Sequence, residues 1–306
     1  MSGVRWNEMT SGSVTVRCAE RDDLGRLAQW LCRVCSDPES QCLHSWSGES
    51  PDALRERLAG YLDDSELQYL LLERPGELSG AMGAEYDTSL GRAWLHGPHV
   101  LLDDWGGNAE RLFHDLVAML PTEVEHLTAY VNTRNSRARA FFGAHGFSER
   151  DTESHEFWLV PSKDRGSVEG RAVDLRSEHR DSFSALYESL FPAAYYSSDR
   201  VVEMIGRSHH VVVVADGSDV LGFAVSASEV EGSLGEVQFL GVREDCRGRG
   251  LGRELLQSAV NWLVDVAHAP RVSLNVDADL GTARDLYESV GFRLRFSGIG
   301  LGRSRY

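Results

Sequence analysis

The sequence predicts an α/β fold with mixed sheets, arranged as two domains of one design, and three observations support this prediction. The chain has 306 residues, enough for about two domains of ordinary size. Short runs rich in β-branched residues alternate with amphipathic helical runs, which is typical of a mixed sheet flanked by helices. The segment 137–150 (RARAFFGAHGFSER) also matches 282–295 (TARDLYESVGFRLR), so one pattern occurs twice.

The other elements follow in the same order in each half. A strand leading into a helix is expected at 14–31 and again at 171–190. Hairpin strands are expected from 67–73 onward in the first half and at 209–216 and 220–228 in the second. A strand, a helix and a strand come next, at 92–102, 108–120 and 126–132, and at 235–243, 252–267 and 271–277. The order β-α-α-β-β-β-α-β-α-β therefore appears twice.

Each half ends in the repeated segment, which predicts a short helix, a glycine and a strand. Gly146 and Gly291 follow the two helices, where the backbone often needs a positive φ. The polar segment 161–170 (PSKDRGSVEG) lacks periodic apolar residues and is typical of a linker. We therefore expect domains at 1–163 and 164–306.

The charge balance excludes some partners. Lysine and arginine number 31 against 47 acidic residues, a formal net charge of −16. Such a field repels phosphate backbones, so we expect no nucleic-acid partner, although it would attract a cationic amine. No run approaches 20 apolar residues and the N-terminus lacks a signal pattern, so we expect no membrane partner and a cytoplasmic location. The oligomeric state is left open.

The five cysteines offer one possible metal site. Their odd number, without an export signal, argues against a disulfide framework. Cys32, Cys35, Cys42 and His44 could be read as zinc ligands. Cys32 and Cys35 lie three residues apart on a predicted amphipathic helix, however, where that spacing also suits core packing. We favour packing and predict no metal.

Residues 235–260 contain a pattern that can bind a pyrophosphate. A strand ends near Val242, and the glycine-rich turn Arg247–Gly252 (RGRGLG) leads into a helix. Uncovered amides and the positive end of the helix dipole can hold a pyrophosphate there, and Gly250 and Gly252 place no Cβ in its way. Arg247 and Arg249 can add positive charge. A Rossmann fingerprint would come after an early strand, and a P-loop needs G-K-[ST], which is absent.

The turn resembles motif A of the GNAT (Gcn5-related N-acetyltransferase) superfamily, Q/R-x-x-G-x-G/A. Residues 283–292 (ARDLYESVGF) resemble motif B, A-x-x-L-Y-x-x-x-G-F, and the two motifs cover about residues 170–300. The resemblance implies two tandem GNAT-like acyl-CoA N-acyltransferase domains, with acetyl-CoA as co-substrate between two splayed strands. The cofactor-binding residues implied are Leu240, Gly241, Val242, Arg247, Gly248, Arg249, Gly250, Leu251, Gly252 and Arg253.

The same resemblance assigns roles to further side chains. Tyr287 would be the general acid that protonates the leaving CoA thiolate, and Glu236 the general base that deprotonates the acceptor amine. Phe191, Tyr195 and Tyr196 would line the acceptor site. Packing of a half-buried tyrosine, an exposed glutamate at a strand start, and aromatic packing under a loop are the alternatives that the residues leave open.

The first half departs from these motifs. Asp104 stands where the second half has Arg247, and Phe142 where it has Tyr287. We therefore expect a degenerate first domain and a catalytic second one, similar in arrangement to mycothiol synthases. Leu280 stands where the family often has asparagine, so the resemblance implies that one polar contact to the CoA arm is missing or made by another residue. The expected function is N-acetylation of a primary amine on a small molecule or peptide by direct attack. The alternative is a non-catalytic acyl-CoA-binding or regulatory module.

Overall fold

The computed structural model describes residues 14–46, 48, 50–63, 66–74, 77–101, 105–161, 170–192, 194, 196–228 and 234–306. The chain forms two compact units. Unit 1 comprises Met1–Asp151 and Gly298–Tyr306, and unit 2 comprises Thr152–Ser297. The predicted order of elements is confirmed in each half of the sequence, and most ends agree within a few residues.

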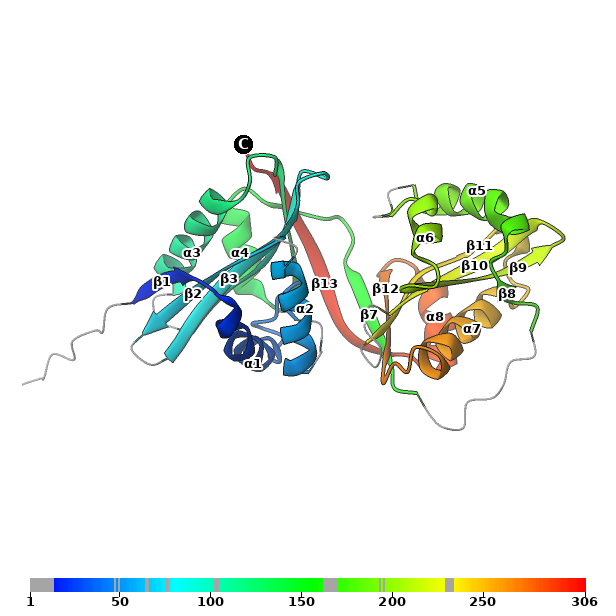
Figure 1. Cartoon of the computed structure of the whole chain (residues 1–306), viewed down its shortest axis with the longest axis horizontal. Helices are drawn as coiled ribbons and strands as arrows, with labels where there is room; N and C mark the ends of the chain where they lie inside the picture. The colour runs from blue at the N-terminus through cyan, green and yellow to red at the C-terminus, as the bar shows by residue number, and fades with distance from the viewer. Residues whose placement is uncertain are drawn as a thin grey trace, which may run out of the picture. The chain divides into compact units, whose positions relative to one another are not determined.

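The sheet of unit 1 has helices on both faces (Figure 1). Alternate residues of strand β2 face different cores: Leu70 and Leu72 join one hydrophobic cluster, and Leu71 joins another. The first cluster holds residues of α3 (Trp105–Met119) and α4 (Ser136–Ala144), and the second holds those of α1 (Leu24–Cys35) and α2 (Pro51–Asp63). The strand order is β1 (Thr15–Cys18), β2 (Leu67–Arg74), β3 (Glu77–Asp87), β4 (Arg92–Val100), β5 (His126–Asn132) and the C-terminal part of β13 (Arg293–Ser304), with β6 (Ser148–Glu149) also pairing with β13.

Unit 2 repeats this design. Val212 and Val214 pack with α7 (Leu251–Asp265), whereas Val211 and Val213 pack on the opposite face with α5 (Arg180–Leu190). Figure 1 shows α5 and α6 (Ser198–Met204) on one face and α7 and α8 (Gly281–Val290) on the other. The strand order is β7 (Ser154–Leu159), β12 (Val272–Asp277), β11 (Gly235–Val242), β10 (Asp219–Ala227), β9 (His209–Asp216) and β8 (Val173–Asp174).

Each unit takes one strand from the other half of the sequence. Strand β7 pairs antiparallel with β12 of unit 2, from Ser154 opposite Asp277 to Leu159 opposite Val272. Residues 298–304 of β13 pair antiparallel with β5 of unit 1. The division of the chain therefore differs from the boundary predicted at 163/164. Both last strands follow the same helix–glycine signature, and that signature does not specify which sheet a strand joins.

The ends of the two repeated helices show one conserved and one altered detail. Gly146 (φ 77°) and Gly291 (φ 110°) have the expected positive φ. Asn135 caps α4, because its side-chain oxygen accepts the Ala138 N–H at 3.0 Å. Leu280 has the same place before α8 and offers no such oxygen. The asparagine missing from unit 2 is therefore a missing helix cap.

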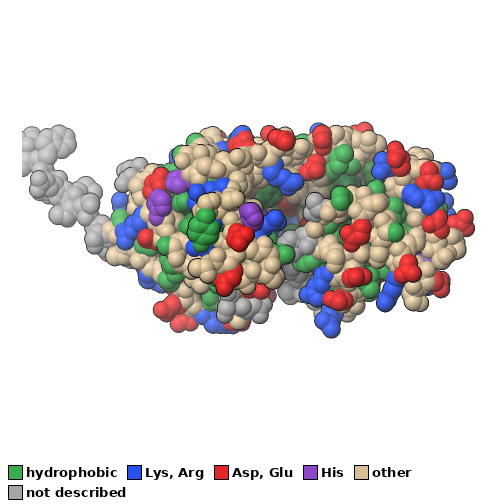
Figure 2. Space-filling model, turned by 90° about the horizontal axis from the view of Figure 1, so that it is seen from above, with side chains coloured by type: hydrophobic (Ala, Val, Ile, Leu, Met, Phe, Trp, Pro, Cys, Tyr) green, Lys and Arg blue, Asp and Glu red, His purple; other side chains and the backbone are tan. Residues whose placement is uncertain are grey.

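The described part of the chain has no helix that is both long and apolar enough to cross a bilayer. On the face drawn in Figure 2, acidic and basic side chains are interspersed over both units.

Replacing Leu301 by alanine should destabilise unit 1, because this β13 side chain is 2% exposed and belongs to the core of that unit. Burial losses of this kind cost about 2–5 kcal/mol. Hydrogen exchange should show faster exchange of the β5 amides, with β12 unchanged. Leu294→Ala on the same strand is the control, since Leu294 is 43% exposed. Undiminished protection of β5 in Leu301→Ala would contradict the assignment of this segment to unit 1.

Candidate active site

Two parallel strands of unit 2 separate in the middle of the sheet. Strand β11 pairs with β12 only from Gly235 opposite Val272 to Val237 opposite Leu274. Strand β11 continues to Val242, and β12 keeps its pairing with β7 on its other side. Among the described residues, the β12-facing edge of 238–242 has no strand partner. Its backbone groups are therefore available to a ligand, in the splayed geometry that the family resemblance implies.

A β-bulge lies where the strands separate. Val225 of β10 is opposite Phe239, but the next residue, Ser226, is opposite Val237, so Gln238 is the extra residue. A bulge of this kind bends the strand and re-aims its side chains. Gly241 lies further along β11, and a Cβ there would be 2.7 Å from Leu190 of α5. Gly241 thus lets the open strand pack closely on α5.

The turn after β11 leaves backbone donors uncovered. Gly248 (φ 74°) and Gly250 (φ 80°) adopt the left-handed conformation, and a Cβ at either would meet nothing within 4 Å. Helix α7 begins at Leu251, and the Glu254 N–H donates to the Gly250 carbonyl at 3.2 Å. The amides of Leu251, Gly252 and Arg253 precede that bond and have no carbonyl one turn earlier. They form a donor group at the positive end of a 15-residue helix.

Three arginines around this turn donate to backbone carbonyls. Arg247 donates to Val242 at 3.2 Å, Arg249 to Asp245 at 2.9 Å, and Arg253 to Ser289 at 3.4 Å. By contrast, Arg243 pairs with the carboxylates of Asp219 and Asp245. Within the described chain, the other three make no ion pair, so their charge is available to an anion.

Tyr287 lies on α8 inside the core of unit 2. The residue is 8% exposed, and its ring centroid is 6.0 Å from that of Phe157 and 6.3 Å from that of Phe292. Burial raises the pKa of its phenol to about 12. The hydroxyl is therefore protonated at neutral pH and can donate.

Glu236 stands at the end of a chain of polar side chains that the sequence analysis missed. Gln238 Nε2 donates to Glu236 Oε2 at 3.4 Å, and His209 Nε2 donates to Gln238 Oε1 at 3.0 Å. The other ring nitrogen of His209 lies 2.8 Å from Ser208 Oγ. The carboxylate is thus the acceptor at one end of the chain. His209 is on β9 and Gln238 and Glu236 are on β11, with β10 between these strands, so only the β9–β10–β11 pairing could have indicated their contact.

The aromatic segment after α5 packs near this chain. The Phe191 ring is 5.1 Å from that of Phe239 on β11, and the Tyr196 ring meets His209 edge-on at 6.0 Å. Tyr187 donates its hydroxyl proton to the Tyr196 carbonyl at 2.9 Å, which fixes the segment. Tyr195 lies outside the described residues. Phe191 and Tyr196 therefore stand beside the bulged part of β11.

Unit 1 repeats the separated strands, but its described residues from Trp105 onward are helical where unit 2 has the glycine turn. Strands β4 and β5 pair only from Arg92 opposite His126 to Leu95 opposite Ala129. Trp105 begins α3, and the Arg137 guanidinium lies over its ring, 5.6 Å from the ring centroid. Phe142 is fully buried and has no hydroxyl, while Asp104 lies outside the described residues. At the places of the glycine turn and Tyr287, unit 1 therefore has the aromatic residues Trp105 and Phe142.

The cysteines that could be read as zinc ligands belong to the core of unit 1. Cys35 Sγ lies 3.6 Å from His99 Nε2, and the Cys42 thiol donates to the Leu95 carbonyl at 3.6 Å. Burial raises the pKa of the Cys42 thiol, so its thiolate form is disfavoured. Among the residues that the structure describes, the one group of three metal-ligating side chains within 4.8 Å of one another is Glu110, His114 and His145.

Comparison with known proteins supports the resemblance of the second half of the chain to the GNAT family. The model of the acetyltransferase (GNAT) family matches residues 172–292. Mycothiol acetyltransferases of Streptomyces coelicolor and Acidothermus cellulolyticus are both 38% identical, over 24% and 37% of this chain. These alignments span only 24% and 34% of those relatives' own lengths.

Solved structures extend the likeness over both units. A GCN5-related N-acetyltransferase from Sphaerobacter thermophilus has a TM-score of 0.68 at 18% identity, covering 95% of this chain and 96% of that one. A tandem GNAT protein from the clavulanic acid biosynthesis pathway has a TM-score of 0.63 at 13% identity, covering 96% and 99%. Residues 172–292 thus match the acetyltransferase (GNAT) family model, and the chain as a whole has the tandem GNAT fold.

Proposed function

We propose that unit 2 transfers the acetyl group of acetyl-CoA to a primary amine by direct attack. The observation that carries the proposal is the junction of two sets of free backbone groups. The open edge of β11 is followed by one 3-10 turn, Glu244–Cys246, and then by the turn at Gly248 and Gly250, where the amides of α7 are uncovered. An extended pantetheine arm can bond along the strand while the diphosphate lies at the helix end.

The proposed reaction uses Glu236 and Tyr287. Glu236 removes one proton from the acceptor ammonium group, and the free amine attacks the thioester carbon, forming the C–N bond. When the C–S bond breaks, Tyr287 protonates the departing thiolate. The remaining extra proton on nitrogen restores the tyrosine, and Glu236 releases its proton to solvent. The hydrogen-bond chain from His209 through Gln238 holds the carboxylate as an acceptor, which suits a base.

The acceptor is proposed only as a class. Phe191, Tyr195 and Tyr196 are the proposed acceptor-binding residues, and an overall acidic protein attracts a cationic amine. The likeness to mycothiol acetyltransferases adds deacetylated mycothiol to the acceptors worth testing.

The alternative is a module that binds acyl-CoA without reacting. A thiol-release assay with acetyl-CoA and deacetylated mycothiol, aminoglycosides and peptide N-termini separates the two. We expect acetyl-CoA-dependent thiol release with at least one amine. Calorimetric binding of acetyl-CoA with no release from any amine would favour the binding module.

Gly250→Asp should abolish measurable CoA binding in calorimetry. The substitution strains a backbone with φ 80° and places a negative charge beside the amides that are proposed to bind the diphosphate. Gly206→Asp is the matched control, because Gly206 also has φ 80° and open space around a Cβ, and it should retain binding. Equal affinities of the two variants would remove the turn from the CoA site.

Tyr287→Phe should lower kcat by about 10²-fold or more, the range expected when a general acid is lost. CoA affinity should change little, since only one hydroxyl is removed. The pKa of about 12 also means that the wild-type acid keeps its proton up to at least pH 10. Tyr69→Phe, at a buried phenol in unit 1, should keep full turnover. Unchanged turnover in Tyr287→Phe would exclude the assigned role.

A further inference from the structure

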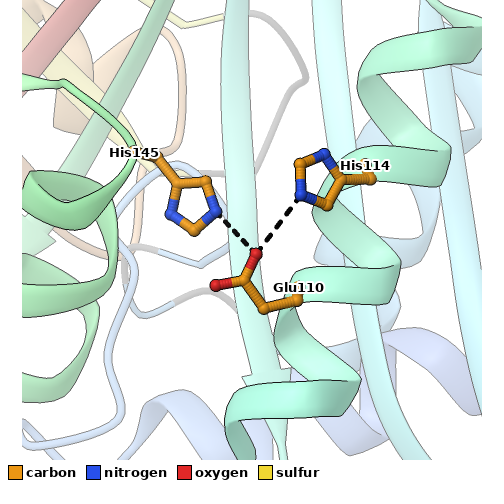
Figure 3. A group of neighbouring side chains, drawn as sticks. All are labelled: Glu110, His114 and His145. Atoms are coloured by element: carbon orange, nitrogen blue, oxygen red, sulfur yellow. Dashed lines mark hydrogen bonds and ion pairs between the residues drawn. The ribbon is translucent and has the colours of Figure 1, made fainter.

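Three potential metal ligands meet on unit 1, whereas the residues proposed for catalysis belong to unit 2. Glu110 and His114 lie one turn apart on α3, and His145 follows the last residue of α4 (Figure 3). We propose that this group binds a divalent transition cation of the zinc class, such as Zn²⁺, Ni²⁺ or Co²⁺. The proposal does not depend on the acetyl-transfer activity.

The distances suit such an ion. Glu110 Oε2 lies 3.3 Å from His114 Nε2 and 2.8 Å from His145 Nε2. Figure 3 shows both imidazole nitrogens directed at this one oxygen. All three ligand atoms lie within 4.8 Å of one another. A tetrahedral zinc site with bonds near 2.0–2.2 Å separates neighbouring ligand atoms by about 3.3 Å. Small side-chain rotations therefore suffice to close the group around a cation.

A second hydrogen bond orients His145 as a ligand. Its Nδ1 lies 2.8 Å from the Phe141 carbonyl, which can only accept, so Nδ1 carries the proton. In the neutral ring, Nε2 then presents a lone pair toward Glu110. Metal-bound histidines are commonly held this way, with the outer nitrogen donating to a backbone carbonyl. The rings of Phe113 and Phe141 pack around His145 at 4.6 and 4.3 Å and fix it further.

A cation satisfies this arrangement more completely than a proton. The His145 lone pair and the Glu110 carboxylate are both acceptors 2.8 Å apart, so a positive charge is needed between them. Protonation of His145 would satisfy that single contact, whereas a metal ion would use all three side chains. Two imidazoles and one carboxylate favour zinc-class ions, because Ca²⁺ and Mg²⁺ prefer oxygen ligands. Water can fill the fourth position.

Binding would link α3 to the end of α4. A ligand that binds the folded state alone stabilises it. Metal should therefore raise the melting temperature of the protein, and the increase should depend on all three side chains.

The test uses the full chain, free of metal and of any affinity tag. Calorimetry with Zn²⁺ should show one site, and Co²⁺ should give the visible absorption of a tetrahedral ion. Glu110→Gln and His114→Ala should each weaken Zn²⁺ binding about tenfold or more. Both side chains are solvent-exposed, at 47% and 69%, so the variants should fold.

Two control variants should bind as the wild type does. His210→Ala removes the histidine of an isolated pair, in which Nε2 lies 2.9 Å from Asp174. Cys18→Ser removes an exposed thiol that could capture metal by itself. Equal Zn²⁺ affinity in wild type and His114→Ala, or no binding in wild type, would overturn the proposal and leave an ion pair only. Zinc stabilisation that persists in Glu110→Gln would overturn it as well.

Discussion

Backbone hydrogen-bonding groups that the fold leaves unpaired are the constraint on which the proposed site depends. The pairing of β11 with β12 stops at Val237, and the first amides of α7 have no carbonyl one turn earlier. Unpaired amides are tolerated only where water or a ligand reaches them. Left-handed glycines at 248 and 250 keep the turn open, so the site is made mainly of main chain, with side chains added around it.

The exchange of strands ties this site to a segment far away in sequence. Phe157 of β7 packs against Tyr287, and Leu274 of β12 lies opposite Phe157 in the sheet of unit 2. The core around the proposed acid therefore includes Phe157 and Leu159 of β7, a strand that precedes the polar linker. A fragment that begins at the linker would lack this strand and leave the edge of β12 unpaired, which is a site for aggregation.

The repeated order of elements could be predicted because periodicity and helix-ending glycines are local signals. Strands 126–132 and 209–216 agree with β5 and β9 at both ends. The destination of β7 and β13 could not be predicted, since a similar helix–glycine signature precedes both strands and pairing depends on tertiary structure. The motifs located the turn, but not the chain from Ser208 through His209 and Gln238 to Glu236. Those contacts arise from sheet register and a bulge.

The two units share one fold, but the residues proposed for catalysis belong to unit 2. Both contain the separated central strands, yet at the place of Tyr287 unit 1 has Phe142, which has no hydroxyl, and among the described residues the glycine turn before the helix belongs to unit 2. Backbone amide NMR during titration with acetyl-CoA tests the central claim most directly. The account predicts large shift changes for Gly250–Arg253 and none for Gly106 and Gly107 at the start of α3. Unchanged signals from Gly250–Arg253 at saturating acetyl-CoA would contradict it.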